Sequence, residues 1–291
     1  MSKVLVTGGC GFIGSHLIDR LIGLGHEVTV IDNLSSGKEE NLNPKAKFIC
    51  YDISNLWWDG SFDYVFHLAA IPGVPYSMEH PTKTHRVNIT GTYNILKASR
   101  DGGVKKVIFA STAALYGDCS RPAKEDDPIC PKSPYAFQKA VGEGYMRLFS
   151  EVYGLPTLSL RFFNVYGERS DPKSPYALVI PIFKALKKQG KPLTIFGDGK
   201  QTRDFIHVSD VVDALISTME SPVENEVINI CSGENITINK LADLIGGEKV
   251  YLPERKGDAP NTIGSNEKAL KLLDWKPKMK LEDGLKTLKV T

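Results

Sequence analysis

The sequence feature that most restricts the fold is an apolar run followed by a glycine-rich turn and a helical pattern. Residues 4–6 are Val-Leu-Val, an apolar and largely β-branched run that predicts a buried strand. Gly8, Gly11 and Gly14 follow, three residues apart. Beyond the turn, apolar residues recur at the spacing of one helix face: Ile13, Leu17, Leu21 and Leu24. This order predicts the first unit of a parallel α/β sheet.

Each of the three glycines omits a Cβ atom for a separate reason. One permits the tight turn, one leaves room for a pyrophosphate against the backbone, and one lets the helix pack closely on the strand. The unpaired N–H groups at the start of the helix would face the phosphates. A glycine turn that binds no ligand is the alternative, and the strand–turn–helix context disfavours it.

A second predicted strand, residues 26–31, ends at Asp32. A carboxylate at this place can hydrogen-bond both hydroxyls of an adenosine ribose, and it would repel a 2′-phosphate. The sequence therefore favours NAD over NADP as the cofactor.

Length and composition limit the class of protein. A chain of 291 residues can bury a large core and exceeds one typical domain. Its formal net charge is +2, so no global field favours nucleic acid or a membrane surface as a partner. Five scattered cysteines without a C-x-x-C pair indicate free thiols in a reducing cytoplasm and no metal site. No apolar run has membrane-spanning length and no signal-peptide pattern stands at the start, so we expect a cytoplasmic protein.

Strand patterns alternate with helical or loop segments through the first half of the chain. This rhythm predicts an α/β, doubly wound parallel sheet of the Rossmann type. Beyond Asn164 the rhythm breaks. We expect residues 1–165 and about 193–232 to form the NAD-binding domain. We expect residues of about 166–192 and 233–291 to form a smaller C-terminal lobe that binds the substrate.

Open doubly wound sheets bind their ligands outside the carboxyl ends of the strands. Small or polar residues follow several predicted strands at these ends. The pattern predicts one crevice that brings together Gly8, Asp32, Asp52, Leu68, Ala69, Ala70, Thr112 and Asn164.

Tyr135 and Lys139 are the sharpest candidates for chemistry, because a spacing of four puts both on one helix face. A tyrosine has a pKa of about 10 and is a poor base at neutral pH. A nearby ammonium and a positive nicotinamide ring would both favour the phenolate, and lowering the pKa by about three units takes roughly 4 kcal/mol. A tyrosine–lysine pair also arises by chance at this spacing, so the pair alone leaves both interpretations open.

Joined to the other motifs, the pair indicates a family. The turn T-G-x-x-G-x-x-G from Thr7 to Gly14, Asp32, Ser111-Thr112 and Y-x-x-x-K, in this order, resemble the short-chain dehydrogenase/reductase superfamily. Further stretches resemble its extended branch, which modifies nucleotide sugars and includes the UDP-galactose 4-epimerases: Asp32-Asn33-Leu34, His67-Leu68-Ala69-Ala70, Leu115-Tyr116-Gly117, Arg161-Phe162-Phe163-Asn164, Arg203-Asp204-Phe205-Ile206-His207-Val208 and Arg255-Lys256-Gly257-Asp258.

The resemblance implies roles for three groups of residues. Tyr135, Lys139 and Thr112 would be catalytic, and no metal is implied. Tightly held NAD would contact Gly8, Gly11, Phe12, Ile13, Gly14, Asp32, Asn33, Asp52, Ile53, Leu68, Ala69, Ala70, Asn88, Ser111, Tyr135, Lys139 and Phe162. The nucleotide sugar would contact Thr112, Asn164, Phe196, Arg203, Arg255, Asp258 and Thr262. Two arginines suit a diphosphate, although surface ion pairs with neighbouring aspartates are the alternative.

The implied reaction interconverts UDP-galactose and UDP-glucose by transient oxidation at C4. Tyr135 would take the proton of the sugar 4-hydroxyl while a hydride passes from C4 to NAD, and Thr112 would hydrogen-bond that oxygen. Ala113 and Ala114 stand where dehydratases of the branch have an acidic pair and decarboxylases a glutamate, so neither reaction is expected. The small Thr262 matches the position beside the sugar C2 substituent, which predicts that N-acetyl forms fit as well.

Two other interpretations stay open. The chain could be another enzyme of the branch, such as a 4-ketoreductase. It could also be a non-catalytic NAD-binding regulator, but a regulator would not need Tyr135, Lys139 and Thr112 together.

Two long helices are expected near residues 85–100 and 135–153. The resemblance implies that such a pair forms a homodimer. Within the second helix, apolar spacing predicts that Phe137, Val141, Tyr145 (with Gly144), Leu148 and Val152 face inward.

Overall fold

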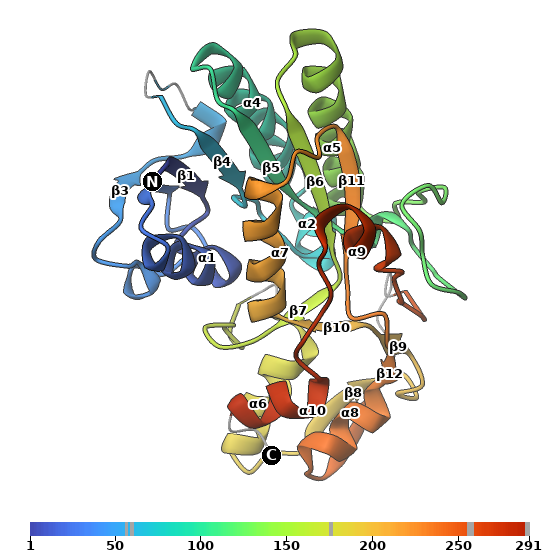
Figure 1. Cartoon of the computed structure of the whole chain (residues 1–291). Coiled ribbons are helices and arrows are strands. Elements are labelled where there is room, and N and C mark those ends of the chain that lie inside the picture. The colour runs from blue at the N-terminus through green and yellow to red at the C-terminus, as the bar shows by residue number, and fades with distance from the viewer. Residues whose placement is uncertain (56–57, 59–60, 175–176, 255–258, 289–291) are drawn as a thin grey trace.

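A parallel sheet of seven strands is the framework of the described residues (Figure 1). The structure is a computed structural model that describes residues 1–55, 58, 61–174, 177–254 and 259–288. The strand order is β11-β6-β5-β4-β1-β2-β3, and all neighbours are parallel. These strands are β1 (Lys3–Thr7), β2 (Glu27–Asp32), β3 (Lys47–Cys50), β4 (Tyr64–His67), β5 (Lys106–Thr112), β6 (Thr157–Phe162) and β11 (Glu226–Ile230). The doubly wound α/β sheet expected from the alternating pattern is confirmed.

Shorter strands pair outside this sheet as β7–β10, β9–β12 and β8–β13. Their bounds are β7 (Asn164–Tyr166), β8 (Leu193–Phe196), β9 (Thr202–Arg203), β10 (Phe205–His207), β12 (Ile236–Thr237) and β13 (Lys249–Leu252). The α-helices are α1 (Phe12–Gly23), α2 (Val74–Glu79), α3 (Pro81–His85), α4 (Thr92–Asp101), α5 (Pro134–Tyr153), α6 (Val179–Lys188), α7 (Val208–Glu220), α8 (Ile238–Ile245), α9 (Glu267–Leu273) and α10 (Leu281–Thr287). Short helical segments of other pitch are η1 (Glu39–Asn41), η2 (Ile53–Asn55), η3 (Arg86–Gly91) and η4 (Ala113–Leu115).

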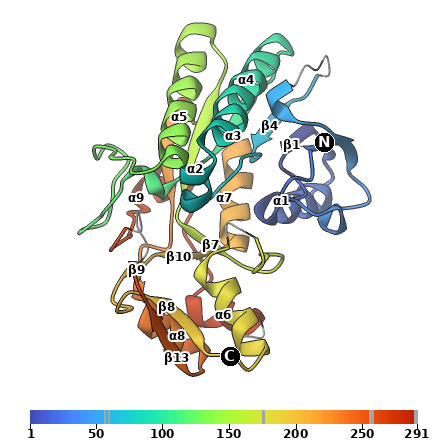
Figure 2. The ribbon, with the colours of Figure 1, turned by 180° about the vertical axis from the view of Figure 1, so that it is seen from behind.

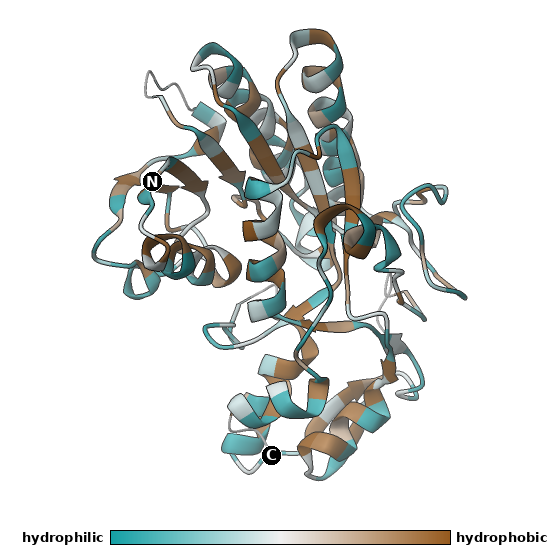
Figure 3. Ribbon diagram, viewed as in Figure 1, coloured by the Kyte–Doolittle hydropathy of each residue, from teal (hydrophilic) through white to brown (hydrophobic). Residues whose placement is uncertain are grey.

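Alternate residues of the strands enter two different cores, one on each face of the sheet. In β1, Val4 and Val6 pack with α1, α7 and α9, whereas Leu5 packs on the other face with α4 and α5. Figure 2 shows α3, α4 and α5 on the face that is turned away in Figure 1. Because both faces of a parallel sheet are covered, most residues of its strands are apolar, and Figure 3 shows the strands largely brown with lighter and teal segments between.

Helix α5 illustrates how local sequence sets an element's ends. The Ser133 side chain accepts a hydrogen bond from the Ala136 N–H, and Pro134 occupies the first turn, where its missing N–H costs nothing. At the other end Gly154 takes a left-handed conformation with φ 66° and stops the helix. The helix therefore starts next to residue 135, where the sequence predicts the second long helix to begin.

Below the carboxyl ends of the strands, α6, α8, α10, β8 and β13 form a smaller lobe (Figure 1). Its core contains Phe183, Leu193, Ile195, Leu241 and Leu285, all fully buried. Thr237 caps α8 by accepting a hydrogen bond from a backbone N–H of the first turn.

Two segments pack in a different core from the one to which the predicted domain boundaries assign them. β8 pairs with β13 and joins the core of the smaller lobe, although it lies within 193–232. α9 and Trp275 pack on the main sheet with α7, although they lie within 233–291. Short apolar runs show that these segments are buried but not which core buries them, so the division stays a proposal with these shifts.

The face of α5 that points inward differs from the prediction. Phe137, Leu148 and Val152 are 58%, 45% and 60% exposed, whereas Val141 and Tyr145 are half-buried. The buried face instead carries Met146 and Phe149 among its residues, and Tyr145 packs at the edge of their core. α5 has apolar residues on two faces, so spacing alone does not decide which face meets the sheet.

None of the described helices is both long and apolar enough to cross a membrane. The five cysteines are free thiols, with Cys10 and Cys231 buried.

Two glycines of α5 give a matched test of its packing. A Cβ added at Gly142 would lie 2.6 Å from the Phe109 ring, whereas a Cβ at Gly144 meets nothing within 4 Å. Gly144→Ala should raise the free energy of unfolding by about 0.5–1 kcal/mol, the usual gain in a helix. Gly142→Ala should lower it by about 1–3 kcal/mol through overpacking. Urea denaturation of both variants measures the two changes in the free energy of unfolding. Changes of the same sign in both variants would contradict the close approach of α5 to β5.

Candidate functional site

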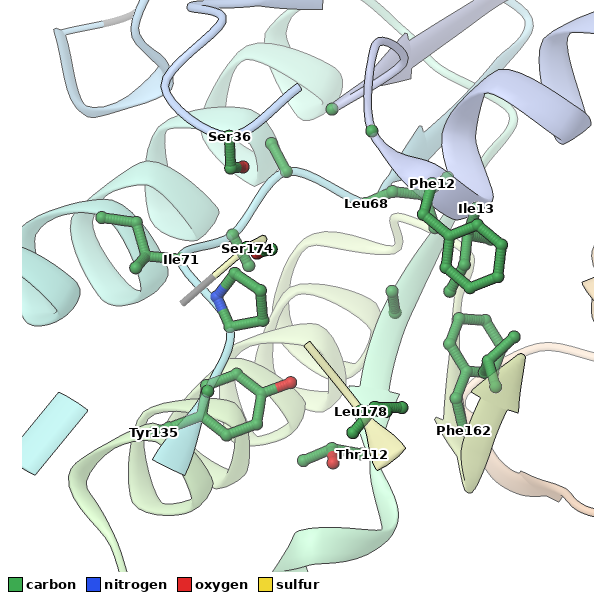
Figure 4. Close-up of a pocket in the computed structure, with 18 of the residues that line it drawn as sticks. Phe12, Ile13, Ser36, Leu68, Ile71, Thr112, Tyr135, Phe162, Ser174 and Leu178 are labelled. Atoms are coloured by element: carbon green, nitrogen blue, oxygen red, sulfur yellow. The ribbon is translucent and has the colours of Figure 1, made fainter. Parts of the chain in front are cut away.

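A cavity of about 590 Å³ lies at the carboxyl ends of the strands, where the sequence predicts a crevice. Figure 4 shows Phe12, Ile13 and Leu68 toward one end and Tyr135 and Thr112 toward the other. Most of the predicted site residues line it: Gly8, Gly11, Phe12, Ile13, Gly14, Asp32, Asn33, Ile53, Leu68, Ala69, Ala70, Ser111, Thr112, Tyr135, Lys139, Phe162, Asn164, Arg203 and Thr262.

The glycine turn forms a cradle that Cβ atoms would fill. Gly8 has φ +73°, and a Cβ there would lie 2.7 Å from the Ala69 nitrogen. A Cβ at Gly14 would lie 2.4 Å from the Gly8 carbonyl oxygen, so only glycine lets α1 start this close to β1. No side chain caps the start of α1, which leaves its first N–H groups directed at the cavity. The residues present therefore fit a dinucleotide pyrophosphate.

Asp32 stands at the end of β2 beside this cradle. Its carboxylate accepts hydrogen bonds from the backbone N–H groups of Cys10 at 3.0 Å and Leu34 at 2.8 Å. Burial raises the pKa of Asp32, and these two hydrogen bonds oppose the rise. Each carboxylate oxygen can accept a further hydrogen bond, so the group suits the two hydroxyls of a ribose.

A buried histidine fixes the segment that faces Gly8. His67 bonds the Thr7 hydroxyl through Nδ1 at 2.8 Å and the Thr92 hydroxyl through Nε2 at 3.0 Å. The Thr7 hydroxyl also accepts from the Ala69 N–H, and the Thr92 hydroxyl donates to the Asn88 carbonyl. Burial lowers the pKa of His67 to about 3, with a smaller effect of Lys139, so the ring is neutral and structural.

Tyr135 and Thr112 face each other across the cavity end. Burial raises the pKa of Tyr135 to about 12, and a hydrogen bond with the Thr112 side chain opposes the rise. Lys139, which the sequence predicts to lower this pKa, is not among the groups that shift it, and burial of the phenol dominates. Thr112 also accepts from the Ala114 N–H at 3.2 Å, which begins η4.

Lys139 lies one turn after Tyr135 and is 3% exposed. Its ammonium donates to the Ala110 carbonyl oxygen at 2.7 Å and lies 4.5 Å from the centre of the Phe109 ring. Burial lowers the pKa of Lys139 to about 7, against the attraction of the Glu143 carboxylate. A lysine with this pKa can change its charge near neutral pH.

On the side of the smaller lobe, Asn164 joins three segments. Its side-chain amide donates to the Asp204 carbonyl at 3.1 Å and to the Thr262 hydroxyl at 3.3 Å. The Asp204 carboxylate accepts from Ser232, Gly233 and Gly264, and burial raises its pKa to about 6 despite these bonds. These contacts hold Thr262 at the cavity wall.

Other predicted residues lie elsewhere. Asp52 accepts a hydrogen bond from the Ser54 N–H and does not line the cavity. Asn88 lies behind the wall, where its amide bonds the backbone N–H and carbonyl of Ile71. Phe196 lies in β8, away from the cavity lining. Arg255 and Asp258 fall outside the described residues.

The loop between β7 and α6 also reaches the cavity, although its polar sequence predicts only a surface loop. Asp171 pairs with Lys38 at 3.1 Å, and both line the cavity. Arg169, also on the wall, pairs with Asp19 of α1 at 2.7 Å. Sequence reasoning missed these residues because their partners lie more than a hundred positions away in the chain.

A family model described as the NAD dependent epimerase/dehydratase family matches residues 4–231. Three solved structures are similar over nearly the whole chain. A UDP-glucose 4-epimerase from Thermotoga maritima, solved with UDP-glucose, is 42% identical, with a TM-score of 0.93 and coverage of 98% of this chain and 96% of that one. A UDP-N-acetylglucosamine 4-epimerase from Methanobrevibacter ruminantium, in complex with UDP-N-acetylmuramic acid, is 40% identical, with TM-score 0.93 and coverage of 99% and 98%.

The third is a UDP-glucuronic acid 4-epimerase from Bacillus cereus in complex with UDP-glucuronic acid and NAD. It is 34% identical, with a TM-score of 0.90 and coverage of 98% of this chain and 96% of that one.

The geometry at Asp32 predicts cofactor choice. NADP should bind at least about a hundredfold more weakly than NAD, because its 2′-phosphate would approach a carboxylate within a few ångströms. Asp32→Asn should reduce the difference in affinity between NAD and NADP, since the amide carries no charge. Calorimetry on protein stripped of cofactor measures both affinities, and equal binding of NAD and NADP to the unaltered protein would show that Asp32 does not face the ribose.

Proposed function

The chain belongs to the NAD dependent epimerase/dehydratase family, and from this premise we propose that it interconverts UDP-galactose and UDP-glucose and also accepts their N-acetyl forms. The observation that carries the proposal is the meeting of Tyr135 and Thr112 at one end of the cavity (Figure 4), with Lys139 one helical turn after Tyr135 and also on the cavity wall. The glycine cradle and Asp32 lie along the same cavity, where they would hold NAD.

Tyr135, Thr112 and Lys139 have separate roles in the proposed proton transfer. NAD, when bound, supplies the acceptor and later the donor of the C4 hydride, together with the positive charge of its ring. Tyr135 holds the phenol oxygen that takes the proton of the sugar 4-hydroxyl. Thr112 hydrogen-bonds that phenol and can bond the sugar oxygen as well. Lys139, as an ammonium, stabilises the phenolate one helical turn away.

The cavity wall supports epimerisation over elimination or decarboxylation. Ala113 and Ala114 follow Thr112 and line the cavity, so these two positions offer no carboxyl group beside the sugar. A 4-ketoreductase would consume NAD(P)H at each turnover, whereas the epimerase returns the hydride it removes. Turnover without added NAD(P)H separates these two enzymes. A non-catalytic regulator would leave the buried Lys139 and the Tyr135–Thr112 contact without a use.

Thr262 supports the acceptance of N-acetyl sugars. It lines the cavity, and its hydroxyl is engaged by the amide of Asn164 at 3.3 Å and by the Asp204 N–H at 3.4 Å. These bonds fix a small side chain where the resemblance places the C2 substituent. A threonine lacks the ring volume that would exclude an acetamide.

The proposed dimer uses the exposed apolar face of α5. Phe137, Leu148 and Val152 lie on this face, and Tyr93 of α4 is also exposed. An apolar surface of this kind favours burial against a second copy. We keep the cytoplasm as the proposed location, in line with the five free thiols.

Tyr135→Phe tests the reaction. The variant should lose epimerisation of UDP-galactose by at least about a hundredfold, because only the proton-accepting oxygen is removed. It should still contain bound NAD, measured by release of the nucleotide on denaturation. Tyr145→Phe removes a phenol oxygen from the same helix outside the cavity and should keep wild-type turnover. Near-wild-type turnover of Tyr135→Phe would rule out the proposed proton transfer.

Thr262→Tyr tests the sugar pocket. The ring should suppress turnover of UDP-N-acetylgalactosamine selectively and spare UDP-galactose. Thr262→Ser keeps both the hydroxyl and the small size, so it should convert both sugars. Assays of sugar configuration at saturating substrate give the comparison. If the unaltered protein converts UDP-galactose but leaves UDP-N-acetylgalactosamine untouched, this interpretation of the pocket is wrong.

A further inference from the structure

A buried ion pair lies between α5 and the sheet, beneath the reacting end of the cavity. Arg161 of β6 donates to Glu143 of α5 through Nε at 2.9 Å and Nη2 at 2.8 Å. The two side chains are 5% and 9% exposed, and the guanidinium lies 4.7 Å from the centre of the Tyr116 ring. Apolar residues of similar volume often stabilise a fold as well as such a pair, so stability alone does not account for it.

The pair has a third member that connects it to the reaction. Ser111 donates its hydroxyl hydrogen to Glu143 Oε1 at 2.5 Å. Ser111 immediately precedes Thr112 at the end of β5. Arg161 binds both oxygens of Glu143, so the carboxylate is held in one orientation and offers Oε1 to Ser111. A hydrogen bond to a carboxylate is roughly twice as strong as one between neutral groups.

Helix α5 therefore forms hydrogen bonds with two consecutive residues of β5 just before Thr112. Lys139 donates to the Ala110 carbonyl oxygen at 2.7 Å, and Glu143 accepts from the Ser111 hydroxyl. Both side chains lie on the helix face that also carries Tyr135, because the three positions are spaced by four. These two contacts set the register of α5 against β5 at the place where Tyr135 meets Thr112.

We propose that Glu143, oriented by Arg161 and bonded to Ser111, is a positioning residue that holds Thr112 opposite Tyr135 for proton transfer at the sugar 4-oxygen. The proposal rests on the proposed function, since that supplies the reaction. Glu143 does not line the cavity, so it acts on the reaction through Ser111 and Thr112. A misplacement of about 1 Å at a reacting group can cost about a hundredfold in rate.

The chain offers a matched control for the loss of one hydroxyl between the sheet and α5. Thr157 of β6 donates its hydroxyl hydrogen to the Met146 carbonyl oxygen of α5 at 2.9 Å. Like Ser111, Thr157 is buried. Unlike Ser111, it does not line the cavity. Thr157→Val and Ser111→Ala thus remove the same kind of contact at two places along one helix.

With UDP-galactose as substrate, Ser111→Ala should lower kcat by about ten- to a hundredfold. KM and the amount of retained NAD should stay within about twofold of wild type, because the Ser111 hydroxyl is donated to Glu143 and the Ser111 backbone on the cavity wall is kept. Thr157→Val should keep the wild-type kcat. If these contacts served only stability, both variants would change kcat to a similar extent. Neither variant would then lower kcat while leaving KM unchanged.

A crystal structure of Ser111→Ala provides a readout that needs no turnover. The separation between Thr112 Oγ1 and Tyr135 Oη should be larger in this variant than in the unaltered protein, and it should be unchanged in Thr157→Val. The double variant Glu143→Met with Arg161→Met removes both charges of the pair, and it should show the same increase in separation if Ser111→Ala does not fold. Its structure and not its kcat is the readout, because Lys139 also loses the attraction of Glu143.

A wild-type kcat in Ser111→Ala, an equal loss in Thr157→Val, or an unchanged Thr112–Tyr135 separation would each overturn the proposal. If the unaltered protein converts no UDP-sugar, the proposed function fails, and the separation alone then decides whether Glu143 positions Thr112.

Discussion

The molecule depends first on how closely its first helix approaches its first strand. A Cβ at Gly14 would collide with the carbonyl of Gly8, and a Cβ at Gly8 would collide with the backbone at Ala69. Three segments, the end of β1, the start of α1 and the segment after β4, therefore meet at backbone contact. The neutral His67, bonded to Thr7 and Thr92, locks the third segment in place. The other segments of the cavity wall are positioned relative to this junction.

The order of the elements and the location of the site follow from local rules. Strands in a parallel sheet carry their functional residues at one edge, so Asp32, Thr112 and Asn164 could be placed together from the sequence. The spacing of Tyr135 and Lys139 on one helix face likewise needs only the helical period. These are predictions in which each residue's place depends on its own element.

The sequence predicts less well the place of a residue that is set by contacts with a second helix or strand. α5 has apolar residues on two faces, and the face predicted to point inward is the wrong one, because Gly142 on the other face lets the helix lie against Phe109. Glu143 and Arg161 were absent from the predicted site because a buried charge is recognised by its partner, which lies in another element. The amide of Asn88 satisfies the backbone of Ile71, a pairing that no local pattern signals.

The path of the chain between the two cores has a mechanical consequence. After β7 the backbone enters the smaller lobe at α6 and β8, returns to the sheet for α7 and β11, leaves again for α8 and β13, returns for α9, and ends in α10 (Figure 1). Several backbone crossings connect the smaller lobe to the sheet, so a rigid rotation of the lobe would have to bend the chain at every crossing. Small sliding movements of packed helices and rearrangements of short loops are the motions that this path opposes least. Because neither half is one continuous piece of the sequence, a single cut in the backbone cannot separate them.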